Sequence, residues 1–167
     1  MHLGRLLKSE MILMELETEN PPEPEDASIR DRYIWNIKDS VLKELADLMD
    51  KSGRVGNRTR LLRDLQNRER KATTGIGRGF AIPHVRTREA REFLFGLARS
   101  TAGVHFDALD QDPVHIFLCF VAPPHDDQLY LSIYRRIAEA ITTTTVLEEL
   151  MAARDEGEIL RAMKWFD

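Results

Sequence analysis

The sequence predicts an α/β fold, and three observations carry that prediction. The chain has 167 residues, which is enough for one domain with a sizeable core. Two apolar segments, 93–98 and 114–121, indicate strands that are buried on both faces. Several other stretches place apolar residues at helical spacing. Buried strands together with amphipathic helices predict a sheet whose two faces are covered by helices.

Composition and charge narrow the function classes. Hydrophobic residues make up 43% and charged residues 31% of the chain, as in globular domains. The net charge is −4 and basic residues are mixed with acidic ones, so we expect no nucleic-acid partner. Cys119 is the only cysteine and lies in an apolar run, so we expect neither a disulfide nor a cysteine-based metal site. No apolar run approaches the roughly 20 residues of a membrane span, and we expect a cytoplasmic protein without membrane insertion.

The first half of the chain contains a strand, an unusual loop and two helices. Residues 11–16 indicate a strand, and the proline-rich, acidic residues that follow indicate a flexible loop at about 17–30. A helix is predicted over 29–52, and either Asn57 or Thr59 can cap the next one. The apolar stripe of the first helix consists of Val41, Leu42, Leu45, Leu48 and Met49.

The C-terminal part is predicted to be helical. Asp126 or Asp127 can cap a helix that runs to about residue 141. Four threonines at 142–145 are poor helix formers and end it. Two short helices follow at 146–153 and 156–163. The longer helix, which ends near residue 141, has an expected apolar stripe that consists of Tyr130, Tyr134, Ile137, Ala138 and Ile141.

Residues 73–86, with the sequence TTGIGRGFAIPHVR, carry the strongest functional signal. Glycines at alternate positions let backbone N–H groups form an anion-binding concavity. Pro83 ends a short apolar strand, and His84 then stands at the exit of that strand. The stretch predicts a histidine that handles phosphate, either by binding it or by carrying it.

Arg68 precedes His84 by sixteen residues and ends a helix in a charged cluster. Its planar guanidinium matches the geometry of phosphate oxygens. If the glycine segment doubles back, Arg68 can stand beside His84. The alternative is an ordinary solvated helix terminus.

These motifs together resemble a known family, the type-2 enzyme IIA domain of the bacterial phosphoenolpyruvate:sugar phosphotransferase system. The resemblance rests on Arg68-Glu69 and on the run TTGIGRGFAIPH at 73–84. It continues through GVHFDALD at 103–110 and PVH at 113–115, and it covers most of residues 1–167. The family includes the fructose, mannitol and nitrogen-regulatory proteins.

The resemblance implies a fold, a reaction and a set of partners. The implied fold is a single domain, a three-layer α/β/α sandwich around a mixed sheet. His84 is implied to take a phosphoryl group from the phosphocarrier HPr or its nitrogen-branch equivalent. The acceptor is implied to be a IIB domain or a regulatory target protein, and no cofactor is implied. The residues expected to stabilise the phosphoryl group are Arg68, Thr74, Gly75, Gly77 and Tyr130.

Two departures from the family pattern stand out. The family carries a second histidine facing the first, and Tyr130 occupies that position here. A tyrosine can donate a hydrogen bond but is neutral at pH 7, and plain packing on a helix explains it equally well. His125 lies nearby in a loop, where simple exposure is its ordinary explanation. The second departure is the insertion near 17–36.

Three uses of such a protein remain open at this point. A regulatory relay, a sugar-transport relay and a degenerate IIA that only binds other proteins all fit the sequence. The spelling GIGRG resembles the regulatory branch.

Overall fold

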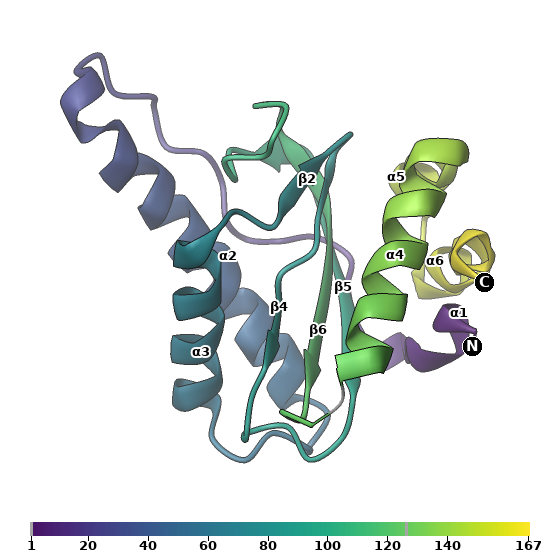
Figure 1. Ribbon diagram of the computed structural model, residues 1–167. Coiled ribbons are helices and arrows are strands. Elements are labelled where there is room, and N and C mark those ends of the chain that lie inside the picture. The colour runs from purple at the N-terminus through teal and green to yellow at the C-terminus, as the bar shows by residue number, and fades with distance from the viewer. Residues whose placement is uncertain (1, 126) are drawn as a thin grey trace.

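The computed structural model describes residues 2–125 and 127–167, which form three layers around a sheet (Figure 1). The sheet has six strands in the order β1-β5-β6-β3-β2, and β4 also pairs with β6. Parallel and antiparallel pairs both occur, so the sheet is mixed. The strands are β1 (Ile12–Leu13), β2 (Gly75–Gly77), β3 (Phe80–Ala81), β4 (His84–Arg86), β5 (Leu94–Val104) and β6 (Val114–Ala122).

Strand β6 is the centre of the sheet and sets the position of the histidine. Along one edge it pairs with β5 in an antiparallel ladder. Along its other edge it pairs first with β3, at Phe80 and Ile116, and then with β4, at His84 and Phe120. Both partners on this edge run parallel to β6, so the chain from Phe80 to Arg86 follows one strand. The register therefore places His84 opposite Phe120.

Helices α2 (Arg30–Asp50) and α3 (Arg58–Lys71) cover one face of the sheet (Figure 1). The predicted stripe of α2 is confirmed, because Val41, Leu42, Leu45, Leu48 and Met49 are all buried. The cap of α3 is also confirmed for one of its two candidates, since Asn57 Oδ1 accepts a 2.9 Å hydrogen bond from the backbone of Arg60. No helix within residues 2–125 and 127–167 is long and apolar enough to cross a membrane.

The opposite face is covered by the two ends of the chain. Helices on this face are α1 (Leu3–Leu6), α4 (Asp127–Thr143), α5 (Val146–Ala152) and α6 (Glu156–Ala162). Short 3₁₀ turns at Ser9–Met11, Ala27–Ile29 and Met163–Phe166 complete the chain. The three-layer arrangement that the resemblance implied is thus confirmed. Of the two predicted caps of α4, Asp126 lies outside the described residues.

The predicted stripe of α4 is wrong in part. Ile133, Ile137, Ala140 and Ile141 are the buried side chains of this helix. Tyr134 is 39% exposed, and Tyr130 is half-buried at the border of the buried face. The prediction counted the tyrosine rings as apolar. In the structure, the aliphatic side chains of the neighbouring helical positions are the ones buried, and the tyrosines lie at the edge of that buried face.

The proline-rich segment after β1 makes specific contacts with its surroundings. The backbone N–H groups of Glu17 and Thr18 donate to the Glu44 carboxylate at 2.8 and 3.0 Å. The Asn20 side chain accepts from the backbone of His105, and the Tyr33 hydroxyl donates to the carbonyl of Pro21. These contacts hold the first half of the segment against α2 and the chain that follows β5.

A buried ion pair connects α2, α3 and the start of β2. Lys38 Nζ lies 2.8 Å from Glu69 Oε1, and both side chains are almost completely buried. The Glu69 carboxylate also accepts hydrogen bonds from the backbone N–H and the hydroxyl of Thr74, at 2.9 and 2.6 Å. The ammonium of Lys38 lies over the Phe106 ring, 4.8 Å from its centroid. The pair therefore fixes the end of α3, beside Arg68, relative to the strand that leads to His84.

We expect Lys38→Met to lower the free energy of unfolding by about 3 kcal/mol, because it leaves a buried carboxylate without its cation. The double variant K38M/E69Q should recover part of this loss, because the neutral amide leaves no charge unpaired. Urea denaturation measures both values.

The matched control is Arg154→Gln, which breaks the exposed pair with Glu158 and should change stability far less. A Lys38→Met loss no larger than that of the control would contradict a stabilising role for the buried pair.

Candidate functional site

His84 is the first residue of β4 and follows Pro83. Its side chain is only 3% exposed. The preceding carbonyl, that of Pro83, accepts a 3.2 Å hydrogen bond from the backbone of Phe120, which continues the ladder with β6. His84 thus lies on a strand that is paired with the central strand β6, and not in a loop.

The two ring nitrogens of His84 have different environments. Nδ1 lies in hydrogen-bond contact with the backbone carbonyl of Ile82. A carbonyl only accepts, so Nδ1 carries the proton and Nε2 keeps its lone pair. Burial lowers the pKa of His84 to about 4, the Ile82 carbonyl opposes that shift, and the nearby Arg68 cation adds to it. The ring is therefore a neutral imidazole at pH 7, with Nε2 as its nucleophilic atom.

Aromatic rings surround the imidazole. Phe120 stacks on it with ring centroids 5.0 Å apart. Tyr130 and Tyr134, one turn apart on α4, approach it at 4.8 and 5.9 Å. This enclosure explains both the burial of His84 and the fall of its pKa.

Arg68 lies on the last turn of α3, beside Tyr130. It donates a 3.0 Å hydrogen bond to the carbonyl of Ala72, which orients the guanidinium at the helix end. Burial raises the pKa of the Tyr130 phenol, and the Arg68 cation acts against that rise. Arg68 thus influences both His84 and Tyr130, so the structure brings together these three predicted site residues.

The other three predicted site residues lie in or next to the hairpin before β4, where the Thr74 carbonyl accepts a 2.9 Å hydrogen bond from the backbone of Ile82. The hydroxyl and N–H of Thr74 are both bonded to Glu69. Gly75 and Gly77 form β2, which pairs with β3 in a hairpin. Ala81 of that hairpin pairs with Phe117 of β6, whereas His84 pairs with Phe120, three residues or about 10 Å further along.

Close packing and turn geometry account for these glycines. A Cβ on Gly75 would come within 2.8 Å of Ala108, and Gly77 has a φ of +95°. The N–H of Gly75 is bonded to the hydroxyl of Thr73. The structure therefore does not bring a glycine anion-binding loop to His84.

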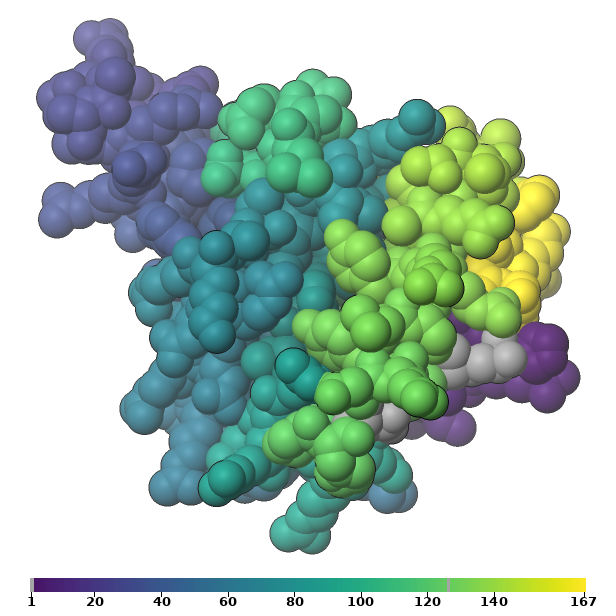
Figure 2. Space-filling view, viewed as in Figure 1, coloured from purple at the N-terminus to yellow at the C-terminus, as the bar shows by residue number. Residues whose placement is uncertain are grey.

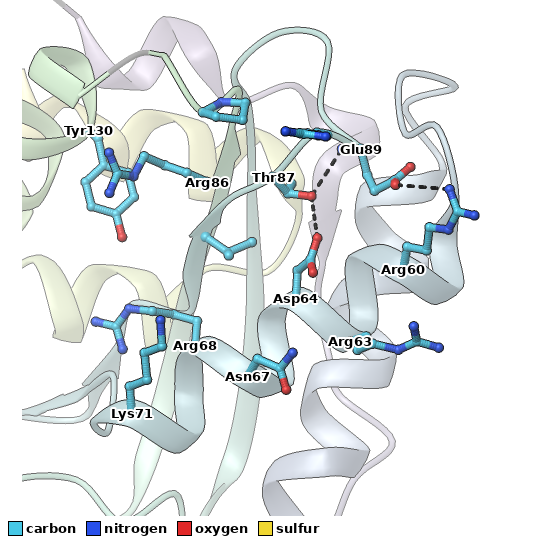
Figure 3. Close-up of a pocket in the computed structure, with 13 residues that line it drawn as sticks. Arg60, Arg63, Asp64, Asn67, Arg68, Lys71, Arg86, Thr87, Glu89 and Tyr130 are labelled. Atoms are coloured by element: carbon cyan, nitrogen blue, oxygen red, sulfur yellow. Dashed lines mark hydrogen bonds and ion pairs between the residues drawn. The ribbon is translucent and has the colours of Figure 1, made fainter.

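A groove of about 890 Å³ opens next to Tyr130 and Arg68 (Figure 3). It runs between α3 and the chain after β4. Thr87 closes its floor by donating a 2.6 Å hydrogen bond to Asp64. The groove is lined by Arg60, Arg63, Asp64, Asn67, Arg68, Lys71, Val85, Arg86, Thr87, Arg88, Glu89, Pro124 and Tyr130.

Three other histidines have surroundings that differ from those of His84. His115 Nδ1 lies 3.0 Å from the Ser100 carbonyl, and His105 packs near the Tyr33 ring. His125 is exposed in the loop before α4. Among the described residues, no group of three or more histidine, cysteine or acidic side chains is placed to hold a metal ion.

Sequence reasoning missed two residues that touch His84. Phe120 contacts it through strand pairing, a register that no local pattern specifies. Tyr134 does so from one helical turn beyond Tyr130, and that spacing was the available signal.

Comparison with known proteins gives a consistent picture. The family described as "Phosphoenolpyruvate-dependent sugar phosphotransferase system, EIIA 2" matches residues 26–165. The fructose-specific EIIA component of Haloferax volcanii is 32% identical over 122 residues, which are 73% of this chain and 79% of the relative. The nitrogen regulatory protein of Pseudomonas aeruginosa is 29% identical over 116 residues, 70% of this chain and 75% of the relative. The fructose-specific EIIABC component of Bacillus subtilis is 28% identical over 130 residues, 78% of this chain but 20% of the relative's length.

Solved structures share the fold. Nitrogen regulatory protein IIA-Ntr of Neisseria meningitidis has a TM-score of 0.80 at 21% identity, over 96% of this chain and 98% of its own. A complex of enzyme IIAMTL and phosphorylated enzyme IIBMTL from Escherichia coli has a TM-score of 0.69 at 16% identity, over 95% and 98%. The motifs, the fold and the match over most of the sequence agree, and the chain belongs to the EIIA type 2 family of the phosphoenolpyruvate-dependent sugar phosphotransferase system.

Proposed function

We propose that this protein is a phosphohistidine relay that accepts a phosphoryl group on Nε2 of His84 and passes it to another protein. The observation that carries the proposal is the fixed tautomer of His84, with Nδ1 tied to the Ile82 carbonyl and Nε2 left as a nucleophile. A pKa of about 4 keeps this nitrogen unprotonated at neutral pH.

The proposed donor group is a phosphohistidine of a carrier protein, and the transfer exchanges one N–P bond for another. The Nε2 lone pair attacks phosphorus, and the N–P bond of the donor breaks with its electron pair returning to the donor nitrogen. The His84 ring becomes a cation that retains its Nδ1 proton, and the donor ring changes from a phosphorylated cation to a neutral imidazole. The hydrogen bond to the Ile82 carbonyl stabilises that new cation.

Arg68 and Tyr130 are the residues proposed to stabilise the transferring group. Phosphoryl transfer depends on positioning and on cationic charge more than on covalent assistance. Arg68 supplies the charge and the Tyr130 hydroxyl can donate a hydrogen bond. Thr74, Gly75 and Gly77 act on the site only by shaping the hairpin that precedes β4.

The proposed donor is an HPr-like phosphocarrier, and the proposed acceptor is a regulatory target or a IIB domain. We favour the regulatory use, on the GIGRG spelling of residues 75–79. The relatives include proteins of both names at similar identity. The proposed location of the exchange is the cytoplasm.

A second candidate is a degenerate IIA that only binds partners. Tyr130 in the place of the family's second histidine motivates it, because a neutral phenol offers less charge to the phosphoryl group than a protonated imidazole. The labelling experiment below separates the two.

We expect the protein to gain one acid-labile phosphoryl group when incubated with phosphoenolpyruvate, enzyme I and an HPr-like carrier, and His84→Ala to gain none. Intact mass before and after mild acid measures this. Labelling of His84→Ala would reject His84 as the acceptor. Absence of labelling in the unmodified protein, with a carrier shown to be phosphorylated, would favour the binding module.

We expect Arg68→Ala to slow this phosphorylation by about 10- to 100-fold, because a cation beside the transferring group is lost. Arg70→Ala is the matched control. Arg70 lies on the same helix but over the Trp35 ring, away from His84. Quenched-flow labelling gives both rates, and equal effects would make Arg68 a bystander.

We expect His84 to make stability depend on pH between about 6.5 and 4. Above this window the ring is neutral in both states. As pH falls through this window, His84 becomes protonated in the unfolded chain but stays neutral in the folded chain. The free energy of unfolding therefore decreases, by at most about 3 kcal/mol at pH 4. His84→Gln removes this component, so its unfolding free energy should fall less steeply over the window. Parallel curves for the two proteins would contradict the lowered pKa.

A further inference from the structure

The groove beside the histidine is strongly basic although the chain as a whole is acidic. Six cationic and two acidic side chains line it, a net charge of +4, while the whole chain carries −4. The cations are Arg60, Arg63, Arg68, Lys71, Arg86 and Arg88. Charge of one sign gathered in a concave surface raises the local concentration of oppositely charged partners.

The arrangement on α3 is a row rather than a cluster. Residues at steps of three or four along α3 border the groove, namely Arg60, Arg63, Asn67 and Lys71, and three of the four are cationic (Figure 3). From Arg60 to Lys71 the row extends about 16 Å, the rise of eleven residues. This length matches the face of a protein partner better than it matches a single phosphoryl group.

The acidic groups of the groove are already engaged. Asp64 accepts the Thr87 hydroxyl, and Glu89 faces Arg60 at 3.9 Å. By contrast, Arg63 and Arg88 form no ion pair with any residue that the structure describes. Arg86 is paired with Asp127, which lies outside the groove lining. The positive charge available to a partner is therefore carried by the unpaired cations.

Apolar surface is exposed on α4, the helix whose Tyr130 lines the groove. Leu131 and Tyr134 on α4 are 63% and 39% exposed, and Tyr134 also contacts His84. On the face shown in Figure 2, α3 and α4 both reach the surface. An apolar area bordered by charge is typical of protein–protein interfaces.

We propose that the phosphocarrier docks over His84 with an acidic face, whose carboxylates meet the cations of the α3 row and the neighbouring Arg88 while its apolar residues cover Leu131 and Tyr134. This inference rests on the proposed relay and adds the chemistry of the partner. Because the contacts are charged and lie at the rim, they act mainly on the association rate and on the choice of carrier.

The test uses the source organism's own phosphorylated HPr-like carrier and measures kcat/KM for transfer to this protein. We expect a fall of about tenfold as sodium chloride rises to about 300 mM, since salt screens charges at the rim. The double variant R63Q/R88Q should lose about tenfold at low salt and lose most of the salt dependence.

The matched control is R5Q/R161Q, which removes two exposed arginines from α1 and α6, on the opposite face of the sheet. It should transfer like the unmodified protein. Transfer that does not depend on salt, or faster transfer to R63Q/R88Q, would overturn the acidic docking face. The same conclusion would follow if a mixed-sequence RNA oligomer bound as tightly as the carrier.

Phosphoramidate, a small phosphoryl donor without a docking face, separates this failure from failure of the relay. Labelling of His84 by phosphoramidate together with a salt-independent carrier reaction rejects only the docking surface. Absence of labelling by both donors rejects the relay itself.

Discussion

The hydrogen bond between Nδ1 of His84 and the carbonyl of Ile82 is the contact on which the site depends. It spans only Pro83, whose ring fixes its own φ and keeps the residue before it extended. Pairing of His84 with Phe120 then holds the ring over that carbonyl. Without this bond the proton could lie on either ring nitrogen, and no single nucleophilic atom would be defined. A backbone acceptor cannot rotate away, so the sheet itself sets the tautomer.

Burial strengthens this arrangement and also constrains it. The rings of Phe120, Tyr130 and Tyr134 exclude water from His84, which lowers its pKa and keeps the lone pair available. A ring that is 3% exposed presents little surface to a partner, so we expect Tyr130 or Tyr134 to move when a partner binds. Both tyrosines lie on the first turns of α4, which contact β4 through an ion pair between Arg86 and Asp127. The backbone carbonyl of Ile82 therefore fixes the tautomer of His84, while residues of α4 cover its ring.

Sequence patterns predicted those parts of the fold that depend on residues only a few positions apart. The stripe of α2 and the cap at Asn57 follow from spacing and side-chain chemistry within a few residues. The glycine segment was different. Its alternate glycines are equally suited to an anion loop and to a tight hairpin, and only the packing of Gly75 on Ala108, thirty-three positions away, decides for the hairpin. The proximity of Arg68 to His84 was suggested by the motif, whereas Phe120 depended on a strand register that the sequence does not encode locally.

The replacement at Tyr130 and the basic groove concern the same problem, which is where the positive charge near the phosphoryl group comes from. A phenol cannot supply that charge, and burial raises its pKa further from neutrality. Arg68 stands against Tyr130, and Arg86 lies over the ring, 5.6 Å from its centroid. Arginine keeps its charge at every physiological pH, whereas a histidine in that position would gain and lose its charge near neutrality. A site whose cations are all arginine or lysine therefore loses a titratable partner but gains a field that does not vary with pH, and this field extends along the groove toward the surface at which we propose that a partner docks.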